Sequence, residues 1–298
     1  MEKIKIFFLT AAIFFLFCIP CLHAQSMDVF VSIPPQKWLI DHIGGERVSS
    51  HVLINKGQDP HTFEPSPVQI AKLASASLYF TTDMPFEKMI VRILQQNSTT
   101  LRIVNAAQDI TKIPIQVHHD THAHHDHGTT LQQNLDPHIW LSPVNLKIMA
   151  HTITATLVNE DPTNKKLYER NLVQVIETLD ELHTKLQHLL APYQGETIFV
   201  FHPSFGYFTH TYNLHQEAVE VAGKTPTPKQ LITIIQKAKE EKIRVIFVQP
   251  QFDTKSGAAV ASAISGRVVP LDPLAEDIID NLLLMGDSIA KALAKEQP

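Results

Sequence analysis

Short apolar runs alternate with helical patterns in the first third of the chain. Val29–Ser32 and Ser77–Thr81 have the length and bounds of strands, whereas Gln36–Ile43 repeats apolar residues at helical spacing. Such alternation is typical of βα units that build a parallel sheet. The same alternation returns from residue 197 to the end of the chain. We therefore predict two α/β lobes, over residues 25–142 and 193–298.

The longest helical pattern lies between these two parts. Apolar residues recur at three- and four-residue spacing from Asn164 to Leu190, and a shorter helical stretch, Pro143–Asn159, precedes them. At ~1.5 Å rise per residue the longer helix would measure about 40 Å. We expect residues 143–192 to form a helical linker whose long helix runs past both lobes.

The N-terminus has the pattern of a secretory signal peptide over residues 1–24. Lys3 and Lys5 precede the apolar run Ile6–Ile19, which is shorter than the ~20 residues of a membrane-spanning helix. Both cysteines, Cys18 and Cys21, lie inside this segment, so the mature chain would contain no disulfide. Neither cysteine follows a small residue, which favours a free periplasmic protein over a lipoprotein.

Histidine is the unusual residue of the composition. The chain has 17 histidines and a formal net charge of −5, and its Lys and Arg residues form no basic stripe, so nucleic-acid binding is not expected. Part of the excess lies in a polar, low-complexity loop at 117–128, which we interpret as an auxiliary zinc-binding segment or as a spacer. Its candidate ligands are His118, His119, His122, His124, His125 and His127.

Four other positions place a metal-binding side chain at the end of a strand or in a loop. They are His61, His138, His202 and Asp272. Loops beyond the carboxyl ends of parallel strands could bring them to one cleft. Three imidazoles and one carboxylate suit tetrahedral Zn²⁺, whereas Ca²⁺ and Mg²⁺ need more oxygen ligands. Mn²⁺ is an alternative that usually prefers a second carboxylate.

The segments around these positions resemble a known family. PHTFEPSP (60–67), DPHIWLSP (136–143), FHPSFGYF (201–208) and LDPL (271–274) are similar to segments of the zinc-type periplasmic solute-binding proteins of ATP-binding-cassette importers. The resemblance implies two four-stranded α/β lobes joined by a rigid helix. It also implies one Zn²⁺ bound by His61, His138 and His202, with Asp272 as fourth ligand or beside it. His202 favours zinc, because manganese members carry a carboxylate there.

The resemblance also implies a function and a partner. We expect a monomer that captures Zn²⁺ in the periplasm and delivers it to a membrane permease, and no enzymatic activity. Gln249, where many members have Glu, is expected near the site but not as a ligand. The alternatives are a manganese-binding receptor, a secreted zinc hydrolase and a surface adhesin. A hydrolase would show a His-Glu-x-x-His helix or a nucleophile elbow, and the sequence contains neither.

Overall fold

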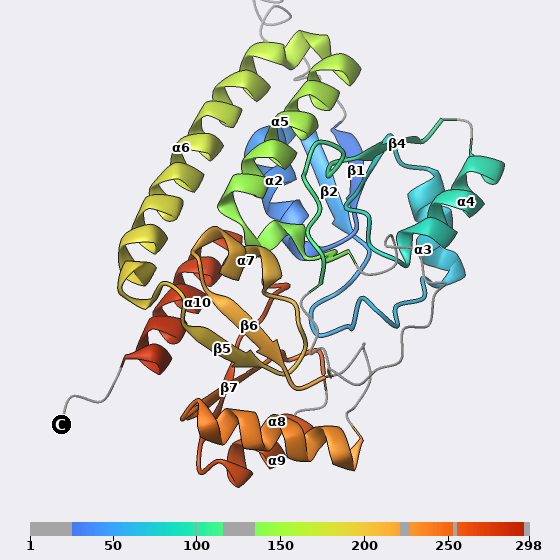
Figure 1. Ribbon diagram of the computed structural model, residues 1–298. Helices are drawn as coiled ribbons and strands as arrows, with labels where there is room; N and C mark the ends of the chain where they lie inside the picture. The colour runs from blue at the N-terminus through green and yellow to red at the C-terminus, as the bar shows by residue number, and fades with distance from the viewer. Residues whose placement is uncertain (1–25, 99, 116–134, 221–226, 253–254, 295–298) are drawn as a thin grey trace, which may run out of the picture.

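The structure, a computed structural model, describes residues 26–294 except 99, 116–134, 221–226 and 253–254. It contains two parallel four-stranded sheets, each with helices on both faces (Figure 1). The predicted signal peptide and the histidine-rich loop lie outside the described residues.

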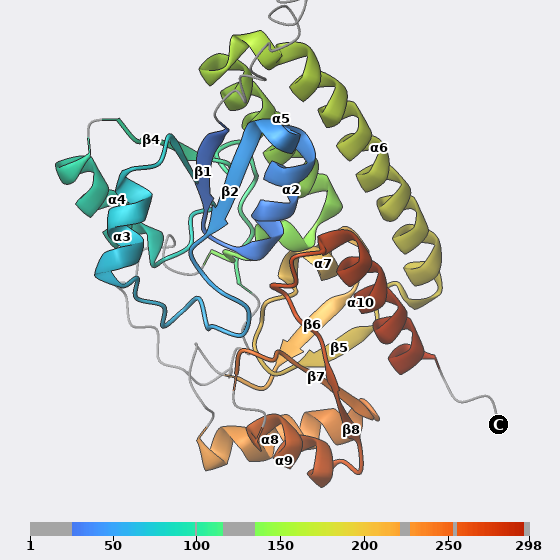
Figure 2. The same ribbon diagram turned by 180° about the vertical axis from the view of Figure 1, so that it is seen from behind.

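The first sheet has the strand order β2-β1-β3-β4, and neighbouring strands are parallel. Its strands are β1 (Met27–Val31), β2 (Val48–Val52), β3 (Leu78–Thr81) and β4 (Arg102–Asn105). Figures 1 and 2 show α2 (Pro34–Gly44) on one face of this sheet and α3 (Pro67–Ala74) and α4 (Glu87–Asn97) on the other. All four residues of β3 are buried, as expected for a central strand covered on both faces.

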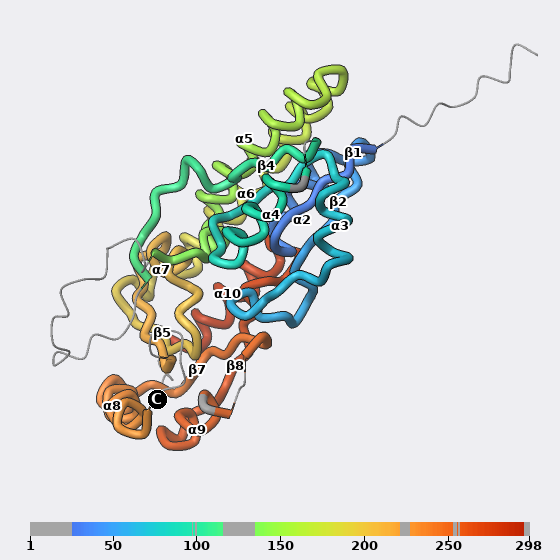
Figure 3. Tube along the Cα trace, turned by 90° about the vertical axis from the view of Figure 1, so that its right-hand side faces the viewer, coloured from blue at the N-terminus to red at the C-terminus, as the bar shows by residue number. Residues whose placement is uncertain are grey.

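The second sheet repeats this arrangement with the order β6-β5-β7-β8. Its strands are β5 (Thr197–Val200), β6 (His215–Ala218), β7 (Val245–Val248) and β8 (Arg267–Pro270). Its helices are α7 (Gly206–Thr211), α8 (Pro228–Glu240), α9 (Lys255–Ala263) and α10 (Ile278–Leu293). In Figure 3, α8 and α9 lie at the far end of this lobe, whereas α7 and α10 lie toward the first lobe.

Two helices connect the sheets. α5 (Pro143–Glu160) runs outward from the first lobe, and α6 (Lys165–Leu190) returns along it and along both α2 and α10 (Figure 1). The inner face of α6 is buried at Tyr168, Val175, Leu179, Leu182, Leu186 and Leu190. One hydrophobic core therefore continues from the first sheet through α6 to the inner face of the second sheet. A smaller core fills the space between the second sheet, α8 and α9.

The predicted fold class is confirmed: two α/β lobes with parallel sheets are joined by one long helix. The sequence pattern of the second lobe also predicts a short strand over Glu217–Val221, but β6 spans His215–Ala218. β6 lies at the edge of its sheet and begins with polar residues. A prediction from hydrophobic residues therefore starts the strand two residues too late. None of the helices within the described ranges is long and apolar enough to cross a bilayer. The exact lobe boundaries remain predictions.

A buried carboxyl group organises the end of β3. Glu87, only 3% exposed, accepts hydrogen bonds from the backbone N–H groups of Thr82 (3.0 Å) and Met84 (2.9 Å). It also contacts the hydroxyl of Ser32, which lies 2.8 Å from the Tyr79 hydroxyl. Burial raises the pKa of Glu87 to about 7, although these hydrogen bonds act to lower it.

The raised pKa of Glu87 predicts a specific pH dependence of stability. The folded chain binds the proton of the Glu87 carboxyl group more tightly than the unfolded chain does. Protonated Glu87 therefore contributes fully to the free energy of unfolding below pH 4.5, and this contribution is lost as pH rises to about 7. The loss should be at most about 3 kcal/mol in the free energy of unfolding. In urea unfolding of metal-free protein, the difference in the free energy of unfolding between the unmodified chain and Glu87→Gln should therefore change by this amount between pH 5 and pH 7.5, because the histidines contribute equally to both. Glu46→Gln, at an exposed position, should keep a constant difference from the unmodified chain over that range; a constant difference for Glu87→Gln as well would contradict the assignment.

Candidate metal centre

Three histidines that are far apart in the sequence lie together between the lobes. His61, His138 and His202 each offer one ring nitrogen, and these nitrogens lie within 4.8 Å of one another. The ring centroids of His61 and His202 are 4.7 Å apart, and His138 lies 5.6 Å and 5.4 Å from them. No other described group of three His, Cys, Asp or Glu side chains has this geometry. The arrangement can hold one metal ion.

The loop between β2 and α3 positions His61. Asp59 accepts hydrogen bonds from the backbone N–H of His61 (2.8 Å) and from the hydroxyl of Thr62 (3.0 Å), which fixes the turn. Phe63 is buried against Phe86, at a centroid distance of 5.3 Å. His61 is therefore carried by a loop that is anchored on both sides of it.

The segment before α5 positions His138. Asp136 Oδ1 accepts from the backbone N–H of His138 (2.9 Å) and lies 2.7 Å from its ring Nδ1. A 3₁₀-helix, Ile139–Leu141, follows at once and is fully buried. Its Trp140 donates from Nε1 to the carbonyl of Pro273 in the second lobe (2.6 Å). With Nδ1 occupied by the carboxylate, Nε2 of His138 is the nitrogen available to a metal.

The end of β5 positions His202. Its Nδ1 contacts Glu220, which follows β6, and its backbone forms two hydrogen bonds with the buried side chain of Gln249 (3.1 and 2.8 Å). Its Nε2 is buried and has no hydrogen-bond partner among the described residues. A buried imidazole nitrogen without a partner is costly unless a ligand binds it, so this atom marks the centre. Gln249 lies beside His202, and that it is not a ligand remains a prediction.

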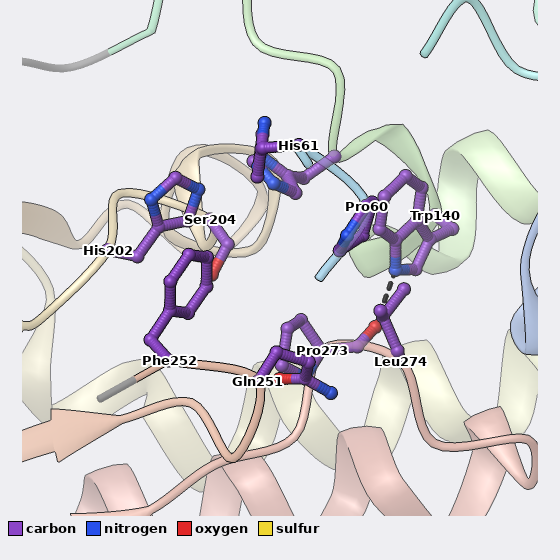
Figure 4. Close-up of a pocket in the computed structure, with 10 residues that line it drawn as sticks. Pro60, His61, Trp140, His202, Ser204, Gln251, Phe252, Pro273 and Leu274 are labelled. Carbon is purple, nitrogen blue, oxygen red and sulfur yellow. Dashed lines mark hydrogen bonds between the residues drawn. The ribbon is translucent and has the colours of Figure 1, made fainter. Parts of the chain in front are cut away.

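Mostly apolar side chains surround the three imidazoles. Figure 4 shows Phe252 beside His202, and their rings stack with centroids 4.5 Å apart. The pocket is also lined by Pro60, Trp140, Ser204, Gln251, Pro273 and Leu274 (Figure 4). The lining therefore comes from both lobes.

The surroundings favour the neutral, metal-binding form of the imidazoles. His61 still reaches solvent, but loss of hydration lowers its pKa to about 3, and the neighbouring His138 and His202 add to this effect. Burial also lowers the pKa of His202, against the opposing effect of Glu220. Neutral imidazoles are the species that bind metal.

Asp272 does not belong to the histidine cluster in this structure. Its Oδ1 accepts hydrogen bonds from the Gln251 side chain (2.6 Å) and the backbone N–H of Leu274 (2.9 Å). These neighbours line the pocket, so the carboxylate lies next to the site. Its role as fourth ligand remains a prediction.

Two carboxylates that contact the histidines escaped sequence analysis. Asp136 was visible in the DPHIWLSP segment, but its contact with the ring two residues later depends on the local turn. Glu220 follows a polar edge strand that pairs with β5, and only this pairing brings it to His202. The six histidines of the predicted auxiliary loop lie outside the described residues.

Comparison with known proteins points to metal transport. The profile of the family described as ZnuA, zinc-uptake complex component A, periplasmic, matches residues 29–295. The chain is 29% identical over 266 residues to a putative metal-binding protein of Chlamydia trachomatis, covering 88% of this chain and 90% of that protein. It is 28% identical over 219 residues to PsaA of Streptococcus anginosus, described as a manganese ABC transporter substrate-binding lipoprotein, covering 72% and 69%.

A solved structure supports the same relationship. The crystal structure of a zinc-bound deletion mutant of ZnuA matches with a TM-score of 0.82 and 38% identity. The match covers 92% of this chain and all of that chain.

The lowered pKa of His61 can be tested in metal-free protein. Its imidazole should remain neutral from pH 8 down to about pH 4, as followed by the ring resonances in NMR titration, because protonation would place a charge in a poorly hydrated pocket. In urea-unfolded protein the same ring should titrate near 6.5. The folded chain therefore loses stability as pH falls below 6.5. A folded-state midpoint near 6.5 would contradict this prediction.

Proposed function

Since the chain belongs to the family of periplasmic zinc-uptake complex component A proteins, we propose that it captures one Zn²⁺ ion between its lobes and delivers it to a membrane permease of an ABC transporter. The observation that carries this proposal is the convergence of three imidazoles, one of them with a buried and unpartnered Nε2. The ion is cargo, so the site must both bind it and release it.

The donor set supports Zn²⁺ as the cargo. His61, His138 and His202 supply three nitrogen ligands, and Zn²⁺ binds imidazole at about 2.0–2.1 Å in tetrahedral sites. Asp272 or a water molecule supplies the fourth ligand. Manganese is the second candidate, because a relative is described as a manganese receptor. Nitrogen-rich sites bind Zn²⁺ more tightly than Mn²⁺, which favours zinc here.

Two carboxylates support the ligands. Asp136 and Glu220 each contact the Nδ1 atom of a histidine, His138 and His202 respectively. Such contacts fix the ring orientation and the tautomer, so that Nε2 presents its lone pair to the metal. A site whose ligands are oriented in advance loses less conformational entropy when the ion binds.

The lining of the pocket favours binding over catalysis. A zinc hydrolase needs a water on the metal and a nearby general base. Among the described residues that line the pocket, Ser204 and Gln251 are the polar ones besides the histidines, and neither is a good general base. The neighbouring carboxylate of Asp272 already accepts hydrogen bonds from Gln251 and Leu274. This favours a receptor, in agreement with the family.

The division of the ligands between two lobes suggests how loading is signalled. His61 and His138 come from the first lobe, whereas His202 comes from the second. The lobes share one core through α6, so metal binding should shift local loops and not swing whole lobes. We propose that the permease recognises these loops, that the receptor acts as a monomer, and that it works in the periplasm.

Replacement of His202 tests the site directly. His202→Ala should weaken tight zinc binding at least about 100-fold in calorimetric titration, because one of three imidazole ligands is lost. His210→Ala, which removes an exposed histidine of α7, should bind like the unmodified chain. Each protein is titrated with and without residues 118–127, so that loop binding is measured separately. Equal affinities of the two variants would remove His202 from the centre.

The supporting role of Glu220 predicts a smaller loss. Glu220→Gln should lower zinc affinity about 10- to 100-fold, as is typical when the partner of a ligating histidine is replaced. Glu217→Gln is the matched control, since Glu217 lies on β6 and pairs with Lys237 (2.6 Å). Competition with a chromogenic chelator gives both affinities. If both variants lost affinity equally, the effect would reflect general damage to β6.

A further inference from the structure

We infer that Gly206 and Tyr207, at the start of α7 in the second lobe, are positioning residues for the first-lobe ligand His138, and that they act through Asp136. This inference rests on the proposed zinc-binding function. It concerns residues that touch no ligand nitrogen themselves.

Asp136 is the residue that connects α7 to the ring of His138. Its side chain is fully buried, and Oδ1 serves both the backbone N–H and the ring Nδ1 of His138. Its other oxygen, Oδ2, is buried and has no hydrogen-bond partner among the described residues. No described residue holds the carboxylate by a hydrogen bond to Oδ2, so its position depends on the surface packed against that oxygen.

That surface is the backbone of Gly206. A Cβ atom at position 206 would lie 2.2 Å from Asp136 Oδ2 and 3.3 Å from the side-chain nitrogen of Gln216. Gly206 does not have a left-handed backbone, so glycine is required here for space and not for conformation. Gln216 accepts a hydrogen bond from the backbone N–H of Phe205 (3.1 Å) and is buried. An added methyl group would therefore displace the carboxylate and turn the ring of His138.

Tyr207 provides a second connection from α7. Its hydroxyl accepts a hydrogen bond from the backbone N–H of Ile113 (3.2 Å), and the carbonyl of Ile113 accepts one from the backbone N–H of Asp136 (2.9 Å). Gly206 fixes the side chain of Asp136, and Tyr207 fixes its backbone. The second lobe thus supplies the ligand His202 and also sets the orientation of a ligand in the first lobe.

A double-mutant cycle on the full mature chain tests this connection. Gly206→Ala should weaken zinc binding about 10- to 100-fold, and so should Asp136→Ala, since each disturbs the partner of a ligating histidine. The double variant should bind no more weakly than Asp136→Ala alone, because the added methyl group then has no carboxylate to displace. Losses that multiply in the double variant, or an unchanged affinity of Gly206→Ala, would overturn the inference.

Tyr207→Phe is a second variant that tests the same connection if Gly206→Ala fails to fold. It should weaken zinc binding a few-fold, whereas Tyr212→Phe, which removes the hydroxyl beside His183, should not. A readout without metal is the Nδ1–H proton resonance of His138 in metal-free protein. Both Gly206→Ala and Tyr207→Phe should shift it, and Tyr212→Phe should leave it unchanged. An unshifted resonance in both variants would overturn the inference.

Zinc titration of the unmodified chain separates this inference from the proposed function. If the unmodified chain bound no zinc, the proposed function itself would fail. If it bound zinc tightly while the cycle were additive, only the role of Gly206 would fail.

Discussion

The site depends on the pairing of two buried carboxylates with two imidazoles. Asp136 with His138 and Glu220 with His202 each use the Nδ1 atom, which leaves the Nε2 atoms for an ion. Nε2 of His202 is buried and has no hydrogen-bond partner among the described residues, which costs free energy that a divalent cation would relieve. Metal binding therefore recovers the free energy that the buried, unpartnered nitrogen costs. The surrounding fold must be stiff enough to keep the imidazoles in place before the ion binds.

The stiffness comes from the way the lobes are joined. α6 buries one continuous apolar face against both lobes, and Gly286 of α10 permits close approach to Leu186 of α6. Hydrogen bonds also cross between the lobes near the site, from Trp140 to Pro273 and from Ile113 to Tyr207. These contacts favour small loop movements over a wide hinge motion. They also explain how residues of α7 can influence a histidine carried by the other lobe.

Sequence analysis predicts the alternation of elements, the long helix and the three histidines, because hydrophobic periodicity and proline-rich motifs are local signals. It misplaces β6, whose polar residues His215 and Gln216 carry little strand signal. It also misses Glu220 and Gly206, because the importance of each depends on a contact between segments far apart in the chain. Asp272 shows a related limit of sequence analysis. Its motif predicts a position beside the pocket but does not show which atoms its carboxylate contacts.

The central claim is that His61, His138 and His202 together hold one ion. Its most direct test is anomalous diffraction at the zinc absorption edge, from crystals of the mature protein grown with one equivalent of Zn²⁺. The account predicts a single strong peak among the three imidazoles, about 2.0–2.1 Å from one nitrogen of each. A peak elsewhere, with these three nitrogens left unligated, would contradict it.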